Sequence, residues 1–216
     1  MILIEIAIVF LGTLGLARVF FEVRALQGLI PVLFLYVPLG IVLIRKERPE
    51  DFGLTLQNAK EAIRDTLILC AIFFPPFFFF FSQYQHYFFH ARFAPGIPRD
   101  LLLWSMFQVL LVALPEEVLY RGYFQTMLNR AYSRPYRLLG ASWGPGLIVS
   151  SALFALGHML FDLNPLRANV FFPGLLFGWL RERAPANGRG GLLGPILFHA
   201  VCNIFVKILE VSFVSI

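Results

Sequence analysis

The sequence has little charge for its length. Only 14% of its 216 residues are Asp, Glu, Lys or Arg, whereas a typical soluble domain carries about 25%. In contrast, 58% of the residues are hydrophobic, and the mean hydropathy is +0.74. The 18 Lys and Arg residues stand in short clusters between apolar runs and not along one face, which argues against nucleic acid as a partner. The lipid bilayer is therefore the expected solvent.

Cysteine is also scarce, and no recognisable processing signal opens the chain. Cys70 and Cys202 both fall inside apolar segments, where they are expected to act as small hydrophobic residues and not as disulfide partners. The first 21 residues lack a basic n-region and a small-residue cleavage site, so we expect a retained first span and not a signal peptide. Internal repeats are absent as well, which favours a single domain over 1–216.

Long apolar runs, by contrast, are abundant. A spanning helix needs about 20 predominantly apolar residues. Seven segments come near this requirement, with the fifth and sixth somewhat short: 2–21, 26–44, 65–82, 101–120, 146–161, 168–181 and 192–214. The sequence therefore predicts an all-α, polytopic transmembrane bundle of about seven helices, within a range of six to eight. Residues 101–216 form the part that carries the motifs described below.

The positive charges predict how this bundle is oriented. The connections after the second, fourth and sixth segments hold eleven Lys and Arg residues, and those on the opposite side hold five. Because cytoplasmic loops are enriched in Lys and Arg, we expect a cytoplasmic N-terminus and an outward C-terminus. An integral protein of a bacterial inner membrane fits this pattern.

The fourth apolar segment ends in charges that a membrane span does not normally contain. It reads Leu-Pro-Glu116-Glu117-Val-Leu-Tyr-Arg121-Gly. Glu117 and Arg121 are four residues apart, so on a helix they can form an ion pair that offsets part of the burial cost. Glu116 points about 100° away and has no local partner of opposite charge. It is the candidate general base. In the alternative interpretation, these residues cap the helix end and Arg121 reaches lipid phosphates.

Two further apolar segments supply polar side chains. The fifth contains His158, and the seventh contains His199 and Asn203, which are four apart and share a helix face. Each could be a satisfied packing residue. Since polar groups inside a bilayer must be satisfied within the protein, however, one shared polar cavity is the economical arrangement for all of them. His86 and His90 are also four apart, but they lie among Tyr and Phe residues and are interpreted as part of an interfacial aromatic belt.

These residues resemble three motifs of the CPBP family, also called Abi, which comprises type II CAAX prenyl endopeptidases and bacteriocin-processing proteases. The matching motifs are Glu116-Glu117-x-x-x-Arg121, Phe154-x-x-x-His158 and His199-x-x-x-Asn203. Members are glutamic-type intramembrane proteases. The sequences around Tyr120-Arg121-Gly122 and Gly178-Trp179-Leu180-Arg181 also resemble the family, whereas the first hundred residues do so only in hydropathy.

The resemblance implies a role for each motif residue. Glu116 and His158 would activate the attacking water, His199 and Asn203 would stabilise the oxyanion, and Glu117 and Arg121 would hold the site in shape. No cofactor and no metal would be needed. The substrate would be a membrane-tethered protein or peptide cut near its terminus. Leader peptides or C-terminal sorting helices, as in the myxosortase-like branch, fit a small bacterial chain better than prenylated C-termini.

Three alternatives remain at the level of the sequence. Glu116, His158 and His199 have the ligand types of a catalytic zinc site, although the His-Glu-x-x-His signature is absent. A non-catalytic scaffold or immunity protein could keep the cavity without cutting, but it would not need the costly Glu116. A small transporter could use an intramembrane carboxylate, but matching segments in the first half of the chain are lacking.

Overall fold

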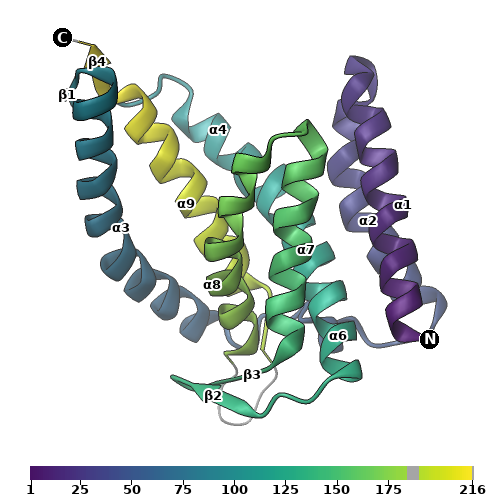
Figure 1. Cartoon of the computed structure of the whole chain (residues 1–216). Helices are drawn as coiled ribbons and strands as arrows, with labels where there is room; N and C mark the ends of the chain where they lie inside the picture. The colour runs from purple at the N-terminus through teal and green to yellow at the C-terminus, as the bar shows by residue number, and fades with distance from the viewer. Residues whose placement is uncertain (184–189, 216) are drawn as a thin grey trace.

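The computed structural model describes residues 1–183 and 190–215, and part of the third positively charged connection (184–189) lies outside this range. Within the described residues the chain forms a bundle of seven helical rods (Figure 1). This confirms the predicted all-α polytopic bundle. The rods are α1 (Ile2–Glu22), α2 (Ile30–Ile44), α3 (Ala59–Phe89), the continuous stretch Leu101–Ala131, α7 (Pro145–Asp162), α8 (Phe171–Glu182) and α9 (Leu193–Val211). Five of the rods are long and apolar enough to cross a membrane: α1, the stretch Arg24–Ile44 that contains α2, α3, Leu101–Ala131 and α9.

The stretch Leu101–Ala131, here called the central helix, carries the first motif. It consists of α4 (Leu101–Phe107), η3 (Gln108–Ala113), α5 (Leu114–Glu117), η4 (Val118–Gln125) and α6 (Thr126–Ala131). The segments η3 and η4 are π-helical and flank the two glutamates on either side. Such wider turns concentrate at functional sites.

The central helix is longer than the predicted segment 101–120, so the prediction of its C-terminal end was wrong. That end was placed at the charged residues, yet the helix continues for 11 further residues to Ala131. It can do so because Glu117, Arg121 and Gln125 are fully buried and have partners inside the bundle. Charge therefore does not mark the membrane surface at this point.

A row of polar residues fastens the central helix to α8. Arg121 Nη2 donates to the carbonyl of Gly174 at 3.2 Å, and Gln125 Nε2 donates to that of Gly178 at 3.0 Å. One turn further on, Asn129 and Gln125 both donate to Glu182, at 2.6 and 2.7 Å. The glycines allow this approach, because a Cβ atom at Gly178 would lie 3.0 Å from Gln125 Oε1. Positions four apart on one helix thus face positions four apart on the other, and we call this contact the polar seam.

The helix α3 lies at the edge of the bundle and its ribbon is curved (Figure 1). Pro75 and Pro76 lie in its interior. A proline inside a helix removes a backbone hydrogen bond and produces such a bend. Its phenylalanine tract has large exposed rings such as Phe79 and Phe80, which are 57% and 69% exposed in the isolated chain. Rings of this kind suit contact with lipid.

Two short sheets lie at opposite ends of the bundle and were not predicted. The strands β2 (Tyr136–Leu138) and β3 (Ala141–Trp143) form a hairpin through Leu139 and Gly140, which both have positive φ. Two such residues are typical of the tight turns that join paired strands. The strand β1 (Ala91–Phe93) pairs with β4 (Phe213–Ser215), so the last helix ends at Val211 and not at 214 as expected.

The positively charged connections meet at one end of the molecule. Arg130 binds Glu47 at 2.5 Å, Arg183 binds Asp65 at 2.6 Å, and Leu192 donates to the carbonyl of Gly53 at 2.9 Å. The N-terminus lies at this end and the C-terminus at the other (Figure 1). The alternation of ends assumed in the charge count therefore agrees with the fold.

Candidate active site

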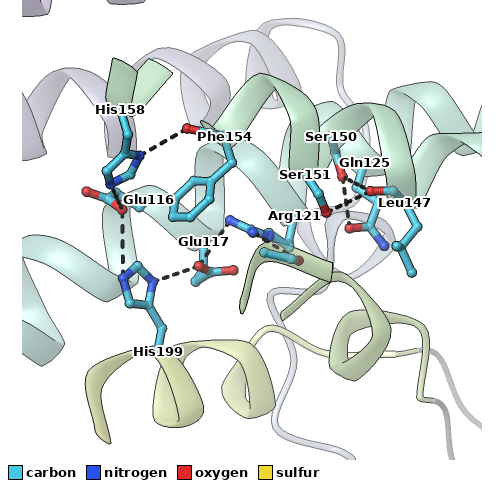
Figure 2. A network of polar contacts seen from close by, with 11 residues as sticks. Glu116, Glu117, Arg121, Gln125, Leu147, Ser150, Ser151, Phe154, His158 and His199 are labelled. Atoms are coloured by element: carbon cyan, nitrogen blue, oxygen red, sulfur yellow. Dashed lines mark hydrogen bonds and ion pairs between the residues drawn. The ribbon is translucent and has the colours of Figure 1, made fainter. Parts of the chain in front are cut away.

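The two adjacent glutamates of the central helix have different surroundings. Glu117 is fully buried and accepts hydrogen bonds from Arg121 Nη1 at 3.2 Å and from His199 Nδ1 at 2.8 Å. Glu116 keeps 16% of its side chain exposed and is directed towards His158 and His199 (Figure 2). The predicted pairing of Glu117 with Arg121 is therefore present, and of the two carboxylates only Glu116 keeps exposed surface.

Arg121 is enclosed by protein on every side. Its side chain has no exposed surface, and its guanidinium carbon lies 4.2 Å from the ring centre of Phe154 and 5.1 Å from that of Phe177. Contacts of this kind with aromatic faces stabilise a desolvated cation. The alternative in which Arg121 reaches out to lipid phosphates is therefore wrong.

Glu116 lies between the two histidines from the other motifs. Its Oε2 atom is 3.9 Å from Nε2 of His158 on α7 and 3.9 Å from Nε2 of His199 on α9. These separations are too long for direct hydrogen bonds, and each is short enough for one water molecule to bridge. Among the described residues, Glu116 Oε2 is buried and lacks a hydrogen-bond donor. The three side chains thus converge on one point (Figure 2).

The second nitrogen of each histidine determines where its proton lies. His158 Nδ1 is 3.0 Å from the carbonyl oxygen of Phe154, which can only accept, so Nδ1 carries the hydrogen. His199 Nδ1 carries its hydrogen towards the ion-paired carboxylate of Glu117. In the neutral rings both Nε2 atoms therefore present lone pairs towards Glu116.

Several residues that hold the site were not singled out from the sequence. The ring of Phe177 on α8 stacks on His199, with centres 4.7 Å apart and an interplanar angle of 12°. Asn203 Nδ2 donates to Gln108 Oε1 at 2.9 Å, so Asn203 is tied to the central helix one turn beyond His199. Gln108 is a polar residue inside an apolar segment, which is a signal that the sequence does contain. The stacking role of Phe177 has no such signal.

The depth of the site follows from the length of the central helix. On a segment ending near 120, Glu116 would lie at the cytoplasmic end, whereas His158 lies near the far end of its own helix. On a helix running from Leu101 to Ala131, Glu116 is at the midpoint. His158 lies near the C-terminal end of α7 (Pro145–Asp162), and its Nε2 is 3.9 Å from Glu116 Oε2, so this end of α7 reaches the midpoint of the central helix.

A cavity of about 260 Å³ lies next to Glu116 and His158. The α1–α2 pair forms its other wall. Its lining includes the apolar residues Leu14, Phe34 and Leu111 and, at the end of the bundle away from the N-terminus, Phe21, Ile30 and Arg167. The Glu116 side chain therefore borders a cavity whose lining is mostly apolar.

The three convergent side chains also have to be considered as ligands of a metal ion. Glu116, His158 and His199 are a ligand set used by catalytic zinc, and a carboxylate behind one histidine is a usual supporting contact. The carboxylate-to-imidazole separations of 3.9 Å are wider than the roughly 3.4 Å between two ligands of a tetrahedral zinc ion. The described side chains therefore fit a bridging water better than a zinc ion as they stand.

His86 and His90 lie away from this site, at the far end of α3. Both are exposed, and the ring of His86 contacts that of Tyr87 with centres 5.3 Å apart. His90 ends the helix with a left-handed backbone conformation, φ 49°. These contacts agree with an aromatic belt at a membrane surface.

Comparison with known proteins identifies one family. Residues 98–205 match the family described as type II CAAX prenyl endopeptidase Rce1-like. The match covers half of the chain and includes all three motifs. No curated protein and no solved structure is detectably similar to the chain.

Proposed function

Because the chain belongs to the Rce1-like family of type II CAAX prenyl endopeptidases, we propose that it is an intramembrane endopeptidase in which Glu116 activates a water molecule. The observation that carries this proposal is the position of Glu116 Oε2, 3.9 Å from two imidazole nitrogens whose lone pairs face it. A water molecule that bridges these atoms donates a hydrogen bond to Glu116 Oε2 and directs its own lone pair at a peptide carbonyl.

The reaction then needs one proton transfer in each direction. Glu116 takes a proton from water as the oxygen attacks the carbonyl carbon, with His158 orienting the water. The same proton passes to the amine as the peptide bond breaks, which restores the carboxylate and leaves a free carboxyl and a free amine. No covalent acyl intermediate forms.

The remaining motif residues position this machinery. Arg121 pairs with Glu117, and Glu117 in turn holds the ring of His199 through Nδ1. By the family resemblance, His199 and Asn203 stabilise the oxyanion. Since Nδ1 of His199 is occupied by Glu117, its Nε2 can donate only when the ring is protonated. The whole arrangement, over 1–216, is proposed to be one domain.

We further propose that the site opens to the outer side of the membrane and acts on a membrane-tethered protein near its terminus. The cavity leads towards the end of the bundle opposite to the positively charged connections, and those connections are expected in the cytoplasm. A cut near the outer surface suits removal of a C-terminal sorting helix, as in the myxosortase-like branch, better than processing of a cytoplasmic prenylated tail.

The test is to map protein termini by mass spectrometry in membranes of cells that carry the wild-type chain or Glu116→Gln. A new terminus beside a membrane span, seen only with the wild type, is the expected result. Its position on the outer or cytoplasmic side of that span decides the direction of the cavity. Identical termini in both membranes would leave a non-catalytic scaffold as the better explanation.

A further inference from the structure

The neutral tautomers of the two histidines offer no hydrogen-bond donor at Nε2, and Asn203 already donates from Nδ2 to Gln108. In their neutral forms His158 and His199 both present acceptors at Nε2, and Glu116 is an acceptor as well. This suits a water molecule, which has two hydrogens to give. The negative oxygen that develops on the substrate carbonyl needs donors instead.

One neutral donor on the cavity wall is the hydroxyl of Tyr120. Tyr120 follows Glu116 by four residues on the central helix, and both side chains line the same cavity. No hydrogen bond to another described residue holds its hydroxyl, and the Tyr120 residue as a whole is only 3% exposed. A hydroxyl that no protein acceptor uses is available to donate to a ligand oxygen.

The packing holds this hydroxyl in one place. The Tyr120 ring makes edge contacts with Phe34, Phe124 and Phe154, at centre distances of 6.5, 5.7 and 5.1 Å. Gly157, the residue before His158, leaves room for the oxygen, because a Cβ there would lie 2.3 Å from it. The hydroxyl therefore ends beside the backbone that carries His158.

We propose that Tyr120 is a catalytic residue whose hydroxyl donates a hydrogen bond to the carbonyl oxygen of the scissile peptide bond and stabilises the oxyanion. This inference rests on the proposed function and adds to it a donor that is available without protonating a histidine. The hydroxyl keeps its proton throughout, so the proton balance of the reaction is unchanged.

The first experiment compares Tyr120→Phe with the wild type on a fluorogenic peptide that spans the mapped cleavage site. Removal of one oxyanion donor typically lowers kcat about 10²- to 10³-fold. We expect a loss of this size in kcat with little change in KM or melting temperature. Tyr123→Phe is the matched control on the same helix, because the Tyr123 hydroxyl binds Glu5 outside the cavity. It should lose stability and keep its kcat.

The second experiment uses Gly157. In the wild type, Gly157→Ala would displace the Tyr120 hydroxyl and lower kcat. In the Tyr120→Phe background the nearest ring atom would lie 3.5 Å from the new methyl group, an ordinary contact. The double variant should therefore have the same kcat as Tyr120→Phe alone.

A third readout separates hydrogen bonding from packing. Replacing Tyr120 by fluorinated tyrosines changes the acidity of the hydroxyl with little change in shape, so kcat should vary with that acidity. A kcat independent of fluorination, or wild-type kcat for Tyr120→Phe, would overturn the inference about Tyr120. The proposed function would survive that result as long as Glu116→Gln is inactive, and it would fall if Glu116→Gln cleaves normally.

Discussion

Glu116 and Glu117 are neighbours in the sequence, yet they make different contacts. Glu116 faces a cavity and has no donor among the described residues, whereas Glu117 is buried between Arg121 and His199. One carboxylate thus borders the cavity, and the other is engaged by two protein donors. The chemistry of the two residues should be separable by mutation.

We expect Glu116→Gln to abolish cleavage and leave the protein folded, because glutamine keeps the shape and loses the base. Glu117→Ala should lower both activity and melting temperature. It leaves Arg121 buried without its partner, and breaking such a pair costs about 3 to 5 kcal/mol. Arg121→Ala should resemble Glu117→Ala.

Cleavage of a fused reporter, measured beside the melting temperature in detergent, checks all three variants. If Glu116→Gln cuts at the wild-type rate while Glu117→Gln is inactive and fully stable, the roles of the two carboxylates are reversed.

Metal dependence can be tested at the same site. Since the proposed base acts on water directly, activity should survive strong chelators, and the purified protein should carry no stoichiometric zinc. Elemental analysis and a chelation series measure this. One zinc per chain, with activity lost on removal and regained on return, would establish a metalloprotease built on Glu116, His158 and His199.

At the scale of elements, two glycines of α8, Gly174 and Gly178, determine how closely this helix packs against the central helix. At Gly178 a Cβ would lie 3.0 Å from both Gln125 Oε1 and Leu147 Cγ. Gly178→Ala should therefore force the helices apart and cost about 1 to 3 kcal/mol, as overpacking typically does.

Thermal unfolding in detergent measures this loss, and Gly12→Ala in α1 is the control. A Cβ at Gly12 has nothing within 4 Å, so this variant should melt at or slightly above the wild-type temperature. Equal melting temperatures for the two variants would show that the polar seam tolerates a wider spacing.

The elements were largely predictable because hydropathy is a property of local sequence. All seven apolar segments became helices, and the three polar motifs led to the residues around Glu116. The end of the central helix was missed, since it depends on partners such as Glu182 that lie far away in the chain. The roles of Phe177 and Tyr120 depend on packing across helices, which no local pattern reports.

At the scale of the whole molecule, the termini lie at opposite ends of the bundle (Figure 1). With the positively charged connections in the cytoplasm, the N-terminus should be cytoplasmic and the C-terminus outside. A bacterial alkaline phosphatase reporter, which is active only outside the cytoplasm, should therefore work when fused after Ile216 and fail when fused before Met1. The opposite pattern would reverse the proposed opening of the cavity.

The polar seam also bears on how the chain is made. The helix α8 has only 12 residues and carries Arg181 and Glu182 in its last turn, so it is a poor substrate for the insertion machinery by itself. Its partners on the central helix leave the ribosome about 50 residues earlier. The side chains that donate hydrogen bonds to α8 are then already present in the bilayer when α8 arrives. Because the central helix is translated first, the side chains that bind α8 are in place before α8 is inserted. A circular permutant that is translated from α8 onwards would have to insert α8 without these partners.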